Sequence, residues 1–156
     1  MVNYMNYGKK LKSIRTSELL SQEKIAEILN IKRSTYKEYE IQNSIIPSKY
    51  LYELSNYFNV CIDYILDLTQ TKQYPNINKE INPIIAGQRL KECRKSLKLT
   101  QSKLAKELNT TQSVIADYER GRYLIATPFL YTICKKFNIS ADYLLGRINE
   151  PKIISK

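Results

Sequence analysis

The ten residues Thr100-Gln-Ser-Lys-Leu-Ala-Lys-Glu-Leu-Asn109 repeat an earlier segment of the same chain, Ser21-Gln-Glu-Lys-Ile-Ala-Glu-Ile-Leu-Asn30. The offset is 79 residues, since 100 − 21 = 79, and it holds without a gap between segments 8–66 and 87–145, where roughly a third of the positions are identical. A repeat fixes the number of domains and their relationship together. The 156 residues therefore contain two copies of one small domain.

Apolar residues recur at helical spacing throughout both copies, and Ser, Thr and Asn stand where helices would begin and end. In the second copy Thr100, Thr111 and Thr127 are the expected N-caps, and Gly121 ends the third helix. No segment alternates with period two for long enough to be a strand. The prediction is an all-α protein of two tandem five-helix domains. The expected helices are 7–17, 22–29, 33–40, 49–58 and 62–68 in the first copy, and 85–97, 101–108, 112–119, 129–137 and one starting after Ser140 in the second.

The helical pattern is interrupted once inside the chain. Residues 69–85 contain two prolines and five side-chain amides, which are typical of a linker. The predicted organisation is domain 1 over 7–68 with its motif at 22–41, the linker, domain 2 over 86–147 with its motif at 101–120, and a tail over 148–156. Fully extended, such a linker would reach roughly 55–60 Å at about 3.3–3.6 Å per residue.

Composition excludes several classes of function. The chain has no histidine, its three cysteines have no metal-ligand spacing, and no Gly-rich phosphate loop is present, so we expect no enzyme, no cofactor, no metal and no small-molecule ligand. No apolar run approaches the ~20 residues of a membrane span. The N-terminus has no secretory signal pattern, so the expected location is cytoplasmic, in association with the nucleoid.

The charge is strongly positive and unevenly divided. The net charge is +10, with nine Lys/Arg against eight Asp/Glu in 7–68 and twelve against five in 86–147. A basic chain indicates an anionic partner. Because two copies of one domain suit two equivalent sites on a symmetric polymer, the expected partner is double-stranded DNA.

Helix two, a tight turn and a third helix with a polar outer face form the helix-turn-helix arrangement. The pattern Leu-x-x-x-Arg…Leu-[Ser/Thr]-Gln-x-x-[Leu/Ile]-Ala-x-x-Leu-Asn…Tyr-Glu…Phe-Asn-[Val/Ile]-x-x-Asp-Tyr-x-Leu occurs in both copies. It resembles the Cro/CI-type (XRE) family, which includes the lambdoid phage repressors, and implies two lambda-repressor-like domains. The first copy departs from the family pattern at two places: Gln42 and Asn43 stand where Glu-x-Gly is usual, and Lys32 stands where a Ser/Thr cap is usual.

The resemblance implies that helix two lies across the phosphate backbone and that helix three enters the major groove. Free N–H groups at the start of helix two suit a phosphate, which places Gln22 and Gln101 beside it. On helix three, glutamine can pair with adenine and arginine with guanine. The outer faces offer Lys32, Arg33, Ser34 and Lys37 in the first copy, and Thr111, Gln112, Ser113, Ala116 and Asp117 in the second. Phosphate contacts after helix three are expected from Arg120 and Arg122, with Asn43 as the weaker counterpart.

Two further sets of residues follow from the resemblance. Arg15 with Glu40, and Arg94 with Glu119, resemble the family's structural ion pair between helices one and three. Family members dimerise through helix five and the preceding loop. The corresponding contact surface, within one chain or between two, would comprise Ile62, Tyr64, Ile65, Tyr143, Leu144 and Leu145.

Three functions remain at this point. The first is a sequence-specific DNA-binding transcriptional regulator, a repressor of phage or mobile-element type. Its two copies would form an intramolecular pseudo-dimer, or two chains a homodimer, over half-sites about 34–36 Å apart. In the second, only domain 2 reads DNA and domain 1 serves dimerisation or a partner. The third is an antitoxin or antirepressor that does not bind DNA.

Overall fold

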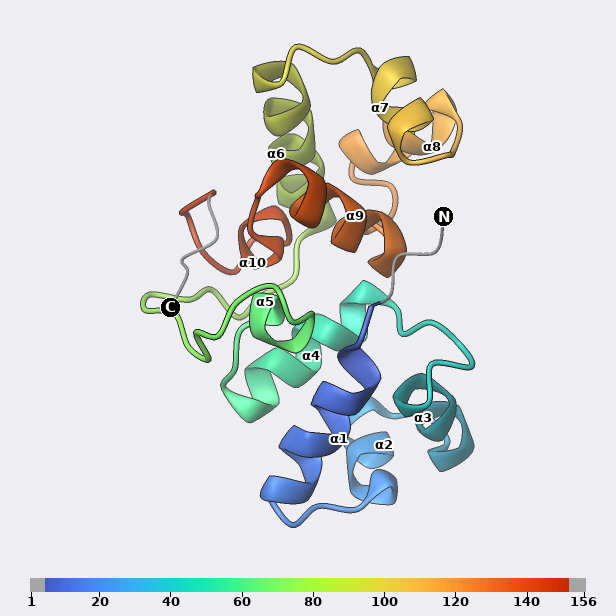
Figure 1. Cartoon of the computed structure of the whole chain (residues 1–156), viewed down its shortest axis with the longest axis vertical. Helices are drawn as coiled ribbons and strands as arrows, with labels where there is room; N and C mark the ends of the chain where they lie inside the picture. Colours follow the sequence, from blue (N-terminus) through green and yellow to red (C-terminus); the bar gives the residue numbers. More distant parts are fainter. Residues whose placement is uncertain (1–4, 152–156) are drawn as a thin grey trace. The chain divides into compact units, whose positions relative to one another are not determined.

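The computed structural model describes residues 5–151, which form ten helices and no strand (Figure 1). The all-α prediction is confirmed. The chain divides into two compact units between Tyr74 and Pro75. The first unit contains α1 (Tyr7–Ser17), α2 (Gln22–Leu29), α3 (Arg33–Glu40), α4 (Ser48–Phe58) and α5 (Ile62–Ile65). The second contains α6 (Pro83–Ser96), α7 (Gln101–Glu107), α8 (Gln112–Glu119), α9 (Thr127–Phe137) and α10 (Ala141–Leu144). None of the described helices is long and apolar enough to cross a membrane.

Each unit builds its core in the same way. In the first unit α3 packs on α1 and α2, and in the second α8 packs on α6 and α7. The buried apolar side chains come from all five helices of each unit: Leu11, Ile25, Tyr36, Leu51, Leu54 and Ile62 in the first, and Leu90, Leu104, Ile115, Leu130, Ile133 and Leu144 in the second. Burial of this apolar surface is the main stabilising contribution to each unit.

Side-chain caps explain where the helix-turn-helix segments begin. Ser21 Oγ accepts a hydrogen bond from the Lys24 N–H (3.0 Å), and Thr100 Oγ1 accepts one from the Lys103 N–H (3.1 Å). Asn30 ends α2 in the left-handed conformation with φ 56°, and Asn109 has the same φ after α7. The predicted caps Ser21, Thr100 and Asn30 are confirmed, whereas α7 ends one residue earlier than expected, at Glu107 with Leu108 as its C-cap.

Thr111 is the N-cap of α8 as predicted, but its Oγ1 makes no capping bond and lies 3.2 Å from Ser113 Oγ. Other expected boundaries were wrong by a small margin. Thr127 is the first residue of α9, and Ala126 is its N-cap. The expected helix 62–68 ends at Ile65, because Asp67 takes the left-handed conformation with φ 60°. Conversely, α6 begins at Pro83 rather than at 85, because Asn82 Oδ1 caps the Ile84 N–H at 3.0 Å.

The segment after the last helix of each unit folds back onto that unit. The Cys61 N–H donates to the Lys72 carbonyl, and the equivalent Ser140 N–H donates to the Pro151 carbonyl, both at 2.7 Å. These positions keep the 79-residue offset, so the structural repeat continues past residue 66. Parts of the expected linker and of the expected tail are therefore packed segments.

The remaining linker is held at two points. The hydroxyl of the buried Tyr74 donates to Asp63 Oδ2 (2.9 Å) in the first unit. The Asn78 N–H donates to the Arg147 carbonyl (2.7 Å) in the second. Between these two residues lie residues 75–77, a much shorter stretch than the seventeen residues of the segment 69–85.

Candidate nucleic-acid interface

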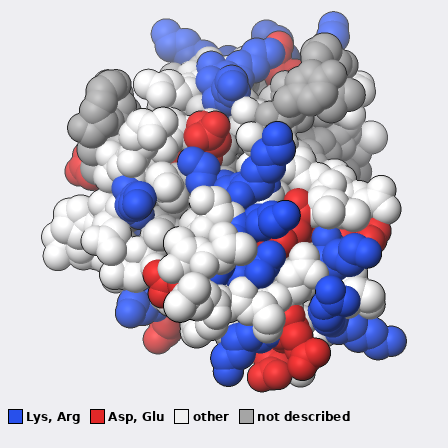
Figure 2. Space-filling model, turned by 60° about the horizontal axis from the view of Figure 1, so that its bottom comes forward, with Lys and Arg blue, Asp and Glu red and all other residues white. Residues whose placement is uncertain are grey.

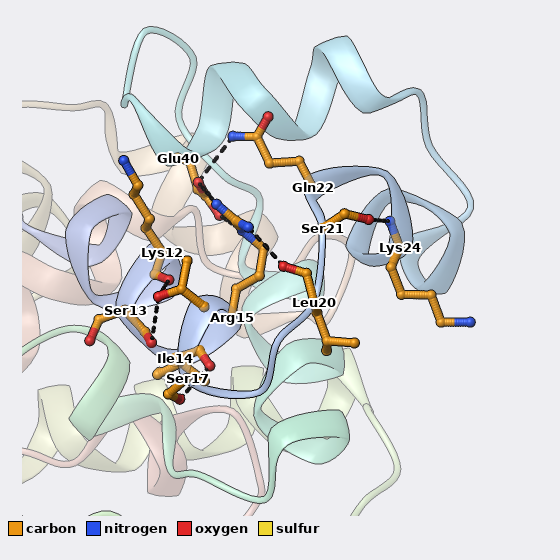
Figure 3. A network of polar contacts seen from close by, with 11 residues as sticks. Lys12, Ser13, Ile14, Arg15, Ser17, Leu20, Ser21, Gln22, Lys24 and Glu40 are labelled. Carbon is orange, nitrogen blue, oxygen red and sulfur yellow. Dashed lines mark hydrogen bonds and ion pairs between the residues drawn. The ribbon is translucent and has the colours of Figure 1, made fainter.

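A buried ion pair fixes the third helix of each unit. In the first unit Arg15 Nε donates to Glu40 Oε2 at 2.6 Å and Nη2 donates to Oε1 at 3.1 Å, which joins α1 to the end of α3 (Figure 3). The same guanidinium donates from Nη1 to the Leu20 carbonyl at 2.8 Å. The Arg94–Glu119 pair reproduces these contacts at 2.6 and 3.0 Å. Two parallel hydrogen bonds of this kind are both strong and orientationally specific.

These contacts also shift the pKa values of Arg15, Glu40 and Arg94. Burial by itself would raise the pKa of Glu40, but hydrogen bonds from Arg15 and Gln22 hold that pKa below its usual value. The hydrogen bond with Glu40 raises the pKa of Arg15, and that with Glu119 raises the pKa of Arg94. These shifts favour the charged forms of Arg15, Glu40 and Arg94.

The two glutamines at the start of α2 and α7 extend these pairs toward the surface. Gln22 Nε2 donates to Glu40 Oε1 at 3.1 Å, as Figure 3 shows, and Gln101 Nε2 donates to Glu119 Oε1 at 2.9 Å. In the second unit Gln101 Oε1 also accepts from Gln112 Nε2 at 2.6 Å. The predicted phosphate-contacting glutamines are thus tied to the interior through their amide nitrogens.

The outer faces of α3 and α8 carry the residues that the sequence predicted there. Lys32, Arg33, Ser34 and Lys37 are exposed in the first unit, and Thr111, Gln112 and Ser113 are exposed in the second. Ala116 and Asp117 are half-buried. Arg120 and Arg122, which follow α8, are also exposed. Figure 2 shows Lys and Arg side chains interspersed with Asp and Glu side chains on the face that is drawn. The outer face of α3 therefore presents exposed cations, and that of α8 presents exposed hydroxyl and amide groups.

The segment that follows the third helix differs between the units. In the second, Asp117 Oδ1 lies 2.6 Å from Arg120 Nη2 and 3.7 Å from Arg122 Nη1. In the first, the residue equivalent to Asp117 is Glu38, whose Oε1 accepts from Asn43 Nδ2 at 2.7 Å. The first unit thus replaces a cluster of charges by a neutral hydrogen-bond donor.

The departures of the first copy leave the helix-turn-helix geometry unchanged. Gln42 takes the left-handed conformation with φ 58°, while its side chain accepts from the Gly8 N–H (2.9 Å) and donates to the Met5 carbonyl (2.8 Å). Gly121, its counterpart, has φ 77°, and a Cβ there would lie 2.7 Å from Ile84 Cα. The glycine makes room for the first turn of α6, which α1 lacks.

Most of the predicted contact surface is core. Ile62, Ile65, Leu144 and Leu145 are fully buried. α5 packs on α1 and α4, and α10 packs on α6 and α9. Tyr64 and Tyr143 are the half-buried members, and each ring is covered by a cation, Lys10 at 4.2 Å and Arg89 at 4.4 Å. The four aliphatic side chains therefore stabilise their own unit rather than form a surface.

One buried pair was not foreseen. Arg147 Nη1 donates to Asp142 Oδ1 at 2.8 Å, with both side chains almost wholly buried. It joins α10 to the segment that follows it, in the same region where Asn78 binds. The sequence signal was a carboxylate five residues before an arginine, at the edge of a short apolar helix, which is too common to single out.

Comparison with known proteins follows this geometry. A helix-turn-helix domain family matches residues 8–71 and 87–150. Over 82 residues the chain is 35% identical to the SPbeta prophage-derived uncharacterized HTH-type transcriptional regulator YonR of Bacillus subtilis, covering 52% of this chain and 76% of that protein.

Two shorter matches are also informative. The HTH-type transcriptional regulator ImmR of Bacillus subtilis is 38% identical over 61 residues, covering 39% of this chain and 48% of ImmR. The immunity repressor protein of Bacillus phage phi105 is 38% identical over 60 residues, covering 38% of this chain and 42% of the repressor. In both cases the match spans less than half of the relative. No solved structure matches the chain significantly. The chain belongs to the helix-turn-helix family and carries that family's domain twice.

Proposed function

We propose that this protein is a sequence-specific double-stranded DNA-binding transcriptional regulator, a repressor of the phage or mobile-element type. The observation that carries the proposal is that each unit fixes its third helix through a buried ion pair and leaves the outer face of that helix exposed. Rigid placement with an exposed polar face is what base recognition in the major groove requires. The similarity to a phage immunity repressor supports the regulatory role.

In this proposal both units read bases, and they read different ones. Arg33 occupies the position of Gln112, and these side chains suit guanine and adenine respectively. Lys37 occupies the position of Ala116, whose methyl group suits thymine. Arg120, Arg122 and Asn43 would contact phosphates beside the groove. The expected target is therefore a pair of unlike half-sites about one helical turn apart.

A second candidate follows from the segment after α3. There the first unit exposes Ile41 and Ile45, with 58% and 52% of their surface accessible, where the second has Arg120 and Leu124. Two exposed isoleucines, one of them in place of Arg120, favour a protein partner or a second copy of the chain for the first unit. In that case only the second unit reads DNA.

Selection of bound sequences from a random duplex pool by the full chain, at about 0.15 M salt, tests these candidates. Two unlike half-sites would support reading by both units, and a palindrome would support a homodimer that reads through one. Two variants then assign the half-sites. Arg33→Ala with Lys37→Ala alters one half-site if the first unit reads bases, and Gln112→Ala alters the other. Enrichment of no sequence would refute the proposed function.

A further inference from the structure

The Asp117 carboxylate occupies an unusual place for a DNA-binding surface. It lies on the outer face of α8, and its side chain is 25% exposed. Glu119, the other acidic residue of α8, forms an ion pair with Arg94. A carboxylate beside the expected phosphate path repels the polyanion and subtracts from affinity. We therefore expect Asp117 to have a role in DNA recognition that offsets this loss of affinity.

The contacts of Asp117 indicate that role. One carboxylate oxygen, Oδ1, faces both arginines that follow the helix, at 2.6 Å from Arg120 and 3.7 Å from Arg122. The two guanidinium side chains are about two-thirds exposed, at 65% and 63%. Exposed ion pairs are weak, so phosphates can displace the carboxylate. In the free protein Arg120 and Arg122 are therefore paired with Asp117. Asp117 itself lies on the helix face that is expected to meet the bases.

What happens to the carboxylate after displacement depends on the base pair that it meets. Cytosine presents an amino donor in the major groove, and Asp or Glu accepts from it. Adenine presents its amino donor beside the N7 acceptor, and guanine and thymine present acceptor oxygens, and these acceptors repel a carboxylate. Release of the arginines is thus favourable where the displaced carboxylate finds a cytosine amino group, and unfavourable elsewhere.

We propose that Asp117 couples base recognition to phosphate binding in the second unit. In the free protein its carboxylate forms ion pairs with Arg120 and Arg122. On DNA the two arginines bind phosphates instead, where the carboxylate accepts a hydrogen bond from a cytosine amino group. This inference rests on the proposed function and assigns Asp117 as a specificity determinant that lowers binding to unrelated DNA.

The first unit supplies an internal control. Glu38 stands at the equivalent position, but its partner is the neutral Asn43 at 2.7 Å, and Ile41 replaces Arg120. Neutralising Glu38 therefore removes one negative charge without releasing a cation. Asp117→Asn and Glu38→Gln have the same effect on net charge and differ in whether arginines are freed.

The experiment compares the full chain, Asp117→Asn and Glu38→Gln in two measurements. The first is the salt dependence of binding to one fixed duplex that lacks the selected site. For Asp117→Asn we expect tighter binding, with a log–log salt slope steeper by about 0.9 for each arginine released to a phosphate. For Glu38→Gln the slope stays within experimental error of the unmodified chain. Thermal unfolding by circular dichroism verifies that each variant is folded.

The second measurement is sequence selection. Asp117→Asn should lose roughly tenfold of its preference at one cytosine-containing base pair, while other positions keep theirs. An unchanged slope together with an unchanged preference overturns the inference. So does weaker binding to the fixed duplex, which would mean that Asp117 positions the arginines for phosphate contact. If the unmodified chain selects no sequence, the proposed function fails, whereas a null result confined to Asp117→Asn overturns the coupling alone.

Discussion

Gln112 donates a hydrogen bond of 2.6 Å to Gln101 across the turn between α7 and α8. Since Gln101 donates in turn to Glu119, the exposed side chain of Gln112 is connected to the buried ion pair. If Gln112 contacts a base, as proposed, a side chain held in this way has fewer rotamers to lose on binding. In the first unit the position of Gln112 belongs to Arg33.

Gln101→Ala should therefore relax sequence discrimination by the second unit. We expect roughly tenfold less preference at the base pair that Gln112 contacts, a loss within the range of one bidentate contact. Competition binding with duplexes altered at that base pair measures it. Gln22→Ala is the matched control, and it should weaken binding to all duplexes about equally. Unchanged discrimination by Gln101→Ala would show that Gln112 needs no such support.

Acidification should destabilise the first unit through Glu40. Its pKa is lower in the folded protein than its ordinary value, so the unfolded chain binds more protons as the pH falls. The stability that ionised Glu40 contributes is present above about pH 4.3 and is lost as the pH falls through the folded-state pKa.

Glu40→Gln isolates this contribution. At pH 7 it should lower the free energy of unfolding by about 3–5 kcal/mol, because Arg15 stays buried without its anion. Near pH 3 the difference from the unmodified chain should shrink. Urea unfolding of the full chain, followed by circular dichroism at both pH values, measures it. The exposed Glu18→Gln serves as control, and a difference independent of pH would contradict the assignment.

Gly121→Ala should destabilise the second unit more than Gly146→Ala. Both glycines have positive φ, 77° and 90°, so both substitutions carry a similar backbone cost of about 1–3 kcal/mol. At Gly121 the new Cβ would also lie 2.7 Å from Ile84 Cα, whereas at Gly146 its nearest neighbour is a side-chain atom at 3.6 Å. Thermal unfolding compares the two. Equal decreases in the melting temperature would mean that Ile84, at the start of α6, can shift to accommodate the new Cβ.

The Arg147–Asp142 pair should couple strongly in a double-mutant cycle. Arg147→Met removes the cation beside a wholly buried carboxylate and should lower the free energy of unfolding by about 3–5 kcal/mol. Adding Asp142→Asn should restore part of that loss, since no buried charge then lacks its counterion. Urea unfolding of both single variants and the double variant completes the cycle. Additive losses would indicate that the two side chains act independently.

The accuracy of the sequence predictions followed the range of the interactions involved. The bounds of α1, α2, α3 and α8 were predicted to the residue, because apolar spacing and helix-terminal residues such as Ser21 and Asn30 act within a few residues. The Arg15–Glu40 contact is long-range, and it was anticipated only through family resemblance. The side-chain role of Gln42 was missed, because its partners lie 34 and 37 residues away.

The segments after α5 and α10 were mistaken for linker and tail for a related reason. Their polar composition is that of a loop, and their order comes from backbone hydrogen bonds such as Cys61 to Lys72. Any residue except proline can donate such a bond, so it leaves no mark on the sequence. The contact surface was misassigned because the aliphatic side chains of α5 and α10 suit a core as well as an interface.

In the proposed function, the anchoring of Tyr74 and Asn78 would affect how the two units bind one DNA molecule. Short tethers give the second of two linked binding events an effective concentration in the millimolar range. With three residues between the anchors, engagement of one unit would leave the other searching a small volume. Two units that each bind DNA weakly would then bind an operator tightly together. Dissociation of the whole protein from the operator would require both units to dissociate within the same short interval.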